Sequence, residues 1–261
     1  MLLLDYKNNK RLHNMSFQAG FKHFPFKEVE LKTDTSFSLK GLRIVQLSDL
    51  HLDKKVDINY VKQLVQKIND IDPDLVVFTG DILQTRANNI KEHIKAFKAL
   101  HVRAYYVSGN HDVIYGLKEL KNLMEHADIT CLDNSISTLH VAGGTLQLVG
   151  LSDRYSFARG IKRPIKELFA KLDKNLPTIL LAHQPKDIQH IKDNKIDIQL
   201  SGHTHGGQIY PLNLLVKFFQ PYFSGLYTDK KTLLYVTNGL GYWGIKIRYK
   251  APSEIPIFTI N

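Results

Sequence analysis

From residue 42 onward the chain alternates short, continuously apolar runs with longer segments whose apolar residues recur every three or four positions. The continuous runs indicate strands buried on both faces, and the recurring spacing indicates amphipathic helices. We predict strands over residues 42–47, 75–78 and 103–107, and helices over residues 58–68, 90–100 and 117–124. Asp57 precedes the first helix and is a residue type suited to cap it. This order predicts a βαβαβ run with parallel strands.

The second half follows a more mixed pattern. Two β-rich stretches on either side of Gly143 and Gly144 predict a hairpin with antiparallel strands. Pro164 and Pro185 each stand where a first helical turn would begin. Further strands are predicted over residues 178–181, 196–200, 233–236 and 255–260. No linker, repeat or low-complexity tract interrupts the alternation, so we predict one α/β domain over residues 26–261 and a peripheral segment over residues 1–25.

The composition is typical of a globular protein, with 43% hydrophobic and 23% charged residues among 261. Every apolar run is far shorter than the roughly 20 residues that cross a bilayer, and the N-terminal run is too brief for a secretory signal. The sequence leaves open whether a membrane anchor precedes residue 1. The single cysteine, Cys131, excludes an internal disulfide and fits a reducing compartment. We therefore expect a cytoplasmic protein, with a peripheral position on the inner membrane as the second reading.

The net charge of +10 and the pI near 9.4 indicate an anionic partner, which would be nucleic acid, phospholipid headgroups or a phosphorylated substrate. One group of cations is distinct, because it lies in a segment with Gly160 and two aromatic residues. Arg154 and Arg159 in this group are candidates for binding a substrate phosphate. Ordinary surface charge is the alternative interpretation of the same cluster.

Polar residues of metal-ligand type follow five of the predicted strands. In order, they are Asp49 with His51, Asp81, Asn110 with His111 and Asp112, His183, and His203 with His205. Each group alone has an ordinary explanation as a turn or a helix cap. A turn explanation gives no reason for all five strand ends to carry oxygen or imidazole donors. Because the carboxyl ends of parallel strands gather at one edge, we expect these side chains to meet in a metal site.

The number of donors indicates two metal ions. Asp49 with His51, and His203 with His205, stand two residues apart, and such pairs point the same way in an extended chain. With the single residues they give more donors than one ion takes, and Asp81 is a carboxylate suited to bridge two ions. The mixture of imidazole, carboxylate and amide oxygen without thiolate favours manganese, iron or zinc, with magnesium as a further candidate.

The ordered strings DLH, GD, GNHD, AH and GHTH resemble the motifs of the calcineurin-like metallophosphoesterase superfamily. The longer strings LSGHTHGGQIYP and GLYTDKKTLLYVTNGLGYWGIKIRYKAPSEI resemble a bacterial branch whose members are often membrane-associated phosphodiesterases. The resemblance implies an α/β fold with four layers, an αββα sandwich of two mixed sheets flanked by helices. It also implies that residues 26–261 form a single domain of this kind.

The resemblance further implies a role for each residue. The first divalent ion would be bound by Asp49, His51 and His205, the second by Asn110, His183 and His203, and Asp81 would bridge the two. His111 would protonate the leaving oxygen or stabilise the phosphoryl charge, and Asp112 would orient His111. A hydroxide held between the ions would attack phosphorus, since metal binding lowers the pKa of water to about 7.

The expected reaction is hydrolysis of a phosphodiester or pyrophosphate in a small-molecule or lipid-linked substrate, such as UDP-2,3-diacylglucosamine. The segment after Asp81 departs from the protein-phosphatase pattern, which disfavours a phosphoprotein substrate. A nuclease or a cyclic-nucleotide phosphodiesterase is the alternative, although nucleic acid is the less favoured partner. A non-catalytic metal-binding scaffold comes last, and no obligate protein partner is indicated.

An apolar stretch at residues 212–223 follows the last histidine pair closely. It would either cover the sheet or contact an anionic membrane surface through Phe218, Phe219, Tyr222 and Phe223.

Overall fold

Two six-stranded sheets form the centre of the computed structural model, which describes residues 24–33, 39–141, 144–191, 196–211 and 220–261. The first sheet has, in spatial order, β1 (Phe26–Leu31), β12 (Ile255–Ile260), β2 (Arg43–Leu47), β3 (Leu75–Thr79), β4 (Ala104–Val107) and β5 (Ile129–Cys131). The second has β10 (Gly225–Asp229), β11 (Thr232–Val236), β9 (Ile198–Ser201), β8 (Thr178–Ala182), β7 (Gly144–Leu151) and β6 (Ser135–Val141). Both sheets are mixed, because β12 is antiparallel to β2, and β6 to β7.

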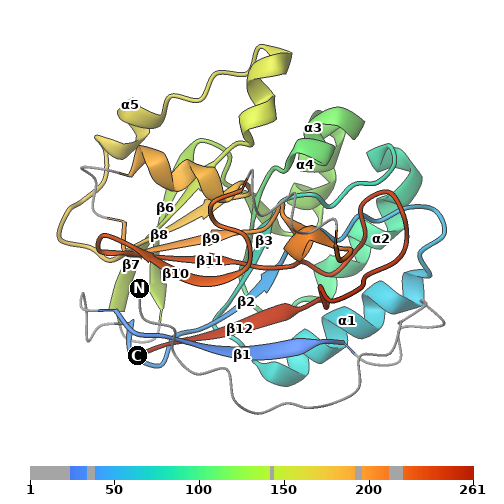
Figure 1. Ribbon diagram of the computed structural model, residues 1–261, viewed down its shortest axis with the longest axis horizontal. Helices are drawn as coiled ribbons and strands as arrows, with labels where there is room; N and C mark the ends of the chain where they lie inside the picture. The colour runs from blue at the N-terminus through green and yellow to red at the C-terminus, as the bar shows by residue number, and fades with distance from the viewer. Residues whose placement is uncertain (1–23, 34–38, 142–143, 192–195, 212–219) are drawn as a thin grey trace.

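Helices cover the outer face of each sheet, so the molecule has four layers (Figure 1). Beside the first sheet lie α1 (Ile58–Ile71), η2 (Ala87–Ile90), α2 (Lys91–Ala96), η3 (Phe97–Ala99), α3 (Asn110–Tyr115) and α4 (Leu117–His126). Beside the second lie η4 (Arg154–Arg159), α5 (Ile165–Phe169) and η5 (Pro185–His190), while η6 (His205–Gly207) follows β9. The predicted αββα sandwich is confirmed.

The apolar strand runs arise because each central strand packs on both faces. In β8, Ile179 and Leu181 join the core between the sheets, while Leu180 packs under the helices of the second sheet. In β3, Val77 faces the core between the sheets and Phe78 faces the helices of the first sheet. A strand with two buried faces has apolar residues at consecutive positions, without alternating polar ones. The continuous apolar runs in the sequence therefore predicted these strands correctly.

The helix predictions are confirmed where the apolar spacing is regular. Helix α1 buries Val61, Leu64, Val65 and Ile68, and its cap residue Asp57 accepts a hydrogen bond from the backbone of Asn59. The predicted helix over residues 90–100 is broken into η2, α2 and η3. The hairpin on either side of residues 142–143 pairs β6 with β7 in antiparallel register.

Strands β1 and β10 were not predicted from the pattern. β1 reads FKEVEL and exposes its charged residues, and β10 reads GLYTD with partly exposed side chains. Both lie at the edge of a sheet, and such strands have one hydrogen-bonding side and part of each face open to solvent. Their sequences therefore lack the apolar continuity of a central strand.

Candidate metal centre

The predicted ligands follow five strands that belong to both sheets. In the first sheet, β2 is followed by Asp49 and His51, β3 by Asp81, and β4 by Asn110 and His111. In the second sheet, β8 is followed by His183, and β9 by His203 and His205. The expectation that strand ends bring these residues together is confirmed for the aspartates and histidines, whose mutual distances follow. The site therefore lies where the two sheets meet, and both sheets contribute residues to it.

The first group of donors contains Asp49, His51 and His205, whose ligand atoms all lie within 4.8 Å of one another. His205 Nε2 lies 3.3 Å from Asp49 Oδ1 and 3.0 Å from His51 Nε2. All three residues are buried. Three donors from two different sheets therefore face one small volume.

The second group contains Asp81, His183 and His203, again with ligand atoms within 4.8 Å of one another. His183 Nε2 lies 3.3 Å from Asp81 Oδ2 and 3.3 Å from His203 Nδ1. The same Asp81 oxygen is 3.7 Å from His51 Nε2, in the first group. Asp81 thus stands between the two groups, as a bridging carboxylate would.

Backbone conformation brings the paired ligands together in a way that the extended-chain argument did not foresee. Asp49, His51, Asp81, His203 and His205 all have positive φ, between 44° and 75°. Non-glycine residues rarely adopt this left-handed region, and such strain gathers at functional sites. The two pairs converge through left-handed turns, so the expectation of alternation along an extended segment was wrong.

Hydrogen bonds behind the site fix two of the imidazole rings. His51 Nδ1 lies 2.8 Å from Gln84 Oε1, and His183 Nδ1 lies 2.7 Å from the carbonyl oxygen of Thr79. Each acceptor holds a ring proton on Nδ1, which directs Nε2 at the donor groups. Neither partner was predicted, because nothing in the local sequence links Gln84 to His51.

Burial and mutual charge set the protonation of the site. Burial lowers the pKa of His51 to about 3 and that of His203 to about 4. Burial acts to raise the pKa of Asp49 and Asp81, but neighbouring His205 and His183, respectively, more than offset it and hold both below their usual range. Burial opposes the charged form of His183, yet Asp81 raises its pKa well above the ordinary value. Ionised carboxylates beside the neutral imidazoles of His51 and His203 suit the binding of cations.

Two side chains at the start of α3 each have a buried polar atom without a hydrogen-bond partner among the described residues. These atoms are Asn110 Oδ1 and His111 Nδ1. The backbone N–H of His111 donates to Asp81 Oδ1 at 2.8 Å, and its ring meets that of His51 edge-on at 4.6 Å. An unpaired buried oxygen beside the donor groups fits a site that takes divalent cations.

Asp112 is fully engaged with the backbone around the site. Its Oδ1 accepts from the N–H groups of Ile82 and Leu83, and its Oδ2 accepts from the Gly109 N–H and the Tyr106 hydroxyl. Burial, with Asp81 nearby, raises the pKa of this carboxyl to about 7. The bonds from Ile82 and Leu83 tie the segment after β3 to the start of α3, and the bond from Tyr106 ties β4 to the same carboxyl group.

Arg248 is a buried residue near the site that the sequence analysis did not single out. Its guanidinium donates to the carbonyl oxygens of His205 at 3.1 Å, Asn238 at 2.8 Å and Gly241 at 2.7 Å. It is only 5% exposed, and burial lowers its pKa to about 10, which leaves it charged near neutral pH. Its Nη2 also lies 3.2 Å from His205 Nδ1. Because most of its partners are backbone carbonyls, no residue type in the sequence signals them.

The two arginines proposed for phosphate binding lie on η4, which packs beside α3. Arg154 Nη1 is 3.5 Å from Asp187 Oδ1, and Arg159 is exposed. Of the apolar stretch, Phe218 and Phe219 lie outside the described residues. Tyr222 and Phe223 are half-buried, and the Tyr222 hydroxyl donates to Asp229 at 2.8 Å.

A protein-family model described as calcineurin-like phosphoesterase matches residues 42–207, which carry every predicted ligand. The chain belongs to this family. An uncharacterized metallophosphoesterase of Helicobacter pylori is 38% identical over 226 residues, which are 83% of this chain and 59% of the relative. Bacillus subtilis YkuE is 33% identical, covering 85% of this chain and 79% of that protein. Chlamydia trachomatis UDP-2,3-diacylglucosamine pyrophosphatase LpxG is 30% identical, covering 83% of each.

The chain spans about three fifths of the length of the Helicobacter and Campylobacter relatives that it matches. Two solved structures share the fold at low identity. The Mycobacterium tuberculosis phosphopantetheinyl hydrolase has a TM-score of 0.51 at 12% identity and covers 83% of this chain and 98% of its own. A Danio rerio dimetal phosphatase has a TM-score of 0.52 at 11% identity and covers 77% of this chain and 88% of its own. Within the described residues, no helix is both long and apolar enough to cross a membrane.

Proposed function

We propose that the chain hydrolyses a phosphodiester or pyrophosphate with the help of two divalent metal ions. The observation that carries this proposal is the position of Asp81, whose carboxylate lies between two groups of buried donors. Asp49, His51 and His205 would hold one ion, and Asn110, His183 and His203 the other. When bound, the ions supply ionised water near neutral pH and neutralise charge on the phosphoryl oxygens.

The remaining chemistry belongs to His111. Its ring is mostly buried, its Nδ1 has no hydrogen-bond partner within the part of the chain that the structure describes, and its backbone N–H donates to Asp81. In hydrolysis, the P–O bond to water forms as the P–O bond to the leaving group breaks. His111 protonates the leaving oxygen or stabilises the phosphoryl charge. Asp112 keeps the backbone of His111 aligned with the segment after β3.

Two variants test this proposal with bis(p-nitrophenyl) phosphate and added manganese. Asp81→Asn is expected to lose both bound metal, measured by mass spectrometry, and hydrolysis. His111→Ala is expected to keep its metal and to lose about 10²- to 10⁴-fold in kcat. His126→Ala, an exposed histidine on α4, is the matched control and should behave as wild type. Full activity in both site variants would overturn the proposal.

For the substrate, we favour a small or lipid-linked phosphodiester or pyrophosphate. The name of the Chlamydia relative, a UDP-2,3-diacylglucosamine pyrophosphatase, supports the lipid-linked class. A screen of nucleotide sugars, cyclic nucleotides, glycerophosphodiesters and oligonucleotides separates this class from the nuclease and cyclic-nucleotide alternatives. Hydrolysis confined to oligonucleotides would reject it.

An anionic membrane surface is the partner that we propose for the face around the site. Phe157 on η4 is 85% exposed, and Trp243 and Ile245 are 61% and 63% exposed in the segment after β11. The exposed cations Arg159 and Lys250 lie in the same two segments. Flotation with phosphatidylglycerol vesicles tests this partner. Phe157→Ser and the double change Phe218→Ser with Phe219→Ser should each reduce binding, and absence of binding by the wild type would reject the partner.

A further inference from the structure

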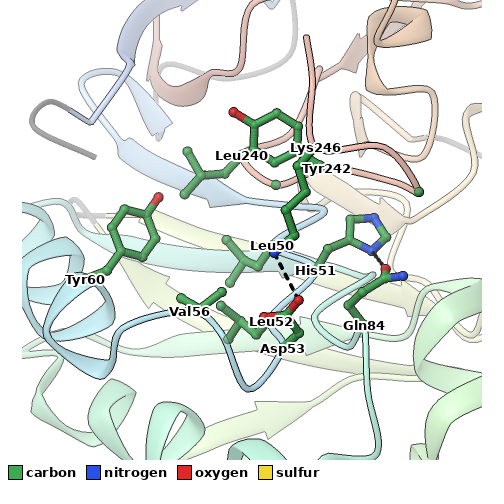
Figure 2. Close-up of a pocket in the computed structure, with 12 residues that line it drawn as sticks. Leu50, His51, Leu52, Asp53, Val56, Tyr60, Gln84, Leu240, Tyr242 and Lys246 are labelled. Carbon is green, nitrogen blue, oxygen red and sulfur yellow. Dashed lines mark hydrogen bonds and ion pairs between the residues drawn. The ribbon is translucent and has the colours of Figure 1, made fainter. Parts of the chain in front are cut away.

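A pocket of about 180 Å³ opens directly beside the candidate metal centre (Figure 2). Its walls are mainly apolar and come from the segment after β2, the first turn of α1 and the segment after β11. Leu50, Leu52, Val56, Tyr60 and Leu240 form these walls. Ligand sites commonly combine apolar walls with a few polar groups that fix orientation, so the composition suits a binding site.

The inner end of the pocket is polar and adjoins the metal centre. His51 and Gln84 both line it, and the bond between His51 Nδ1 and Gln84 Oε1 is 2.8 Å long. The other edge of the same ring places Nε2 at 3.0 Å from His205 Nε2. Figure 2 shows His51 and Gln84 on one side of the pocket and Tyr60 on the opposite side. The pocket therefore begins one imidazole ring away from the donor groups.

Hydrogen bonds hold the wall contributed by the segment after β11. The N–H groups of Leu240 and Gly241 donate to the carbonyl oxygens of Ser48 and Asp49 at 3.1 and 2.7 Å. Arg248 donates to the Gly241 carbonyl from the opposite direction. A Cβ atom at Gly241 would collide with the backbone at Leu50, so the two segments approach as closely as a glycine permits. This wall of the pocket is thus held in place by backbone hydrogen bonds and close packing.

The outer charges of the pocket are paired. Lys246 Nζ lies 3.1 Å from Asp53 Oδ2, and Asp53 is the acidic residue among those that line the pocket. This pairing compensates the negative charge that would otherwise repel an anionic ligand. The Asp53 carboxylate in the pocket wall is therefore not an unpaired negative charge.

We propose that this pocket is a subsite for the apolar arm of an amphiphilic phosphodiester whose phosphate lies at the metal centre. The inference rests on the proposed hydrolytic function and adds the class of substrate. The volume is below the roughly 300–1,000 Å³ of pockets that enclose a whole ligand, so it fits one arm of a larger substrate. Its aliphatic wall residues Leu50, Leu52, Val56 and Leu240 suit a hydrocarbon arm, while His51 and Gln84 at its polar end are bonded to each other.

Two diesters with the same leaving group test the subsite, namely hexyl and methyl p-nitrophenyl phosphate with manganese. The wild type is expected to show a kcat/KM for the hexyl ester roughly tenfold higher or more, since each methylene removed from water contributes about 0.8 kcal/mol. Val56→Phe, which fills the pocket, and Val56→Asp, which makes its wall polar, should both bring this ratio toward one. Leu226→Ser removes an exposed leucine outside the pocket and should keep the ratio.

A binding measurement gives a second readout. Trp243 is the single tryptophan of the sequence and lies between the pocket residues Tyr242 and Gly244. Hexyl phosphate is expected to shift its fluorescence at concentrations where methyl phosphate does not, and Val56→Phe should abolish the difference. Hydrolysis of both esters at equal kcat/KM would overturn the subsite and leave the proposed function intact. Absence of hydrolysis of either ester would count against the function, and the fluorescence difference would then decide the subsite alone.

Discussion

The Nε2 atoms of His51 and His205 face each other at 3.0 Å, although 154 positions separate the two residues in the chain. One follows β2 of the first sheet, and the other follows β9 of the second. Two imidazole nitrogens at this distance need a proton or a cation between them, because their lone pairs otherwise repel. Asp49 and Asp81 lie within 4 Å of these rings, and a bound divalent cation would relieve this repulsion.

Gln84 is expected to set the affinity for metal through His51. Gln84→Ala removes the acceptor that orients the His51 ring, and the loss of such a partner typically costs 10- to 100-fold in metal affinity. Gln84→Glu keeps an acceptor oxygen and should recover most of the affinity. Metal titration followed by calorimetry measures both, with the exposed Gln66→Ala on α1 as control. Equal affinity in Gln84→Ala and wild type would contradict this role.

Gly109 is expected to be required for metal binding because a larger residue would leave no room for the carboxylate of Asp81. A Cβ atom at this position would collide with the carboxylate and the backbone nitrogen of Asp81, whereas its φ of −102° is ordinary for any residue. Gly109→Ala should therefore lower metal content as well as thermal stability. Gly160→Ala is a contrasting control, since its φ is +71° and no atom lies within 4 Å of the added carbon. It should cost about 1 kcal/mol and leave metal content unchanged.

Arg248 is expected to stabilise the segments around the site. Arg248→Met leaves several buried carbonyl oxygens without donors, among them those of Asn238 and Gly241. At roughly 1–3 kcal/mol for each unsatisfied group, the free energy of unfolding should fall by about 3 kcal/mol or more. Urea denaturation followed by circular dichroism gives this value. The exposed Lys231→Met is the control for loss of charge, and a similar small change in both variants would refute the prediction.

Cys131 is expected to be unreactive near neutral pH. Burial, with Glu125 nearby, raises the pKa of its thiol to about 12. At pH 8 roughly one molecule in ten thousand then carries the thiolate that reacts with iodoacetamide. Because the folded-state pKa is raised, the thiol stays protonated until the pH approaches 12, and urea-unfolded protein should react far faster at pH 8. Mass spectrometry of alkylated protein measures both rates, and equal rates would show that the thiol is not shielded.

The sequence predicted the central strands well, whereas among the edge strands it predicted only β6, as part of the hairpin. Strands β3 and β8 were recognised because burial on two faces leaves continuous apolar runs. Strands β1 and β10 were missed because an edge strand is partly exposed to water. The candidate ligands could be singled out because each stands directly after a central strand. Gln84 and Arg248 were not found, since their partners are distant in the chain or are backbone atoms.

By itself, the sequence determined which residues carry the donor atoms, and that their number and types suit two ions. Only the tertiary structure decided that donors from two different sheets meet, with Asp81 between them. It also decided that left-handed backbone at residues such as Asp49 and His203 aims the side chains, and that an apolar pocket adjoins His51. The reason is physical: residue type fixes chemistry locally, whereas distances between segments depend on how the two sheets pack.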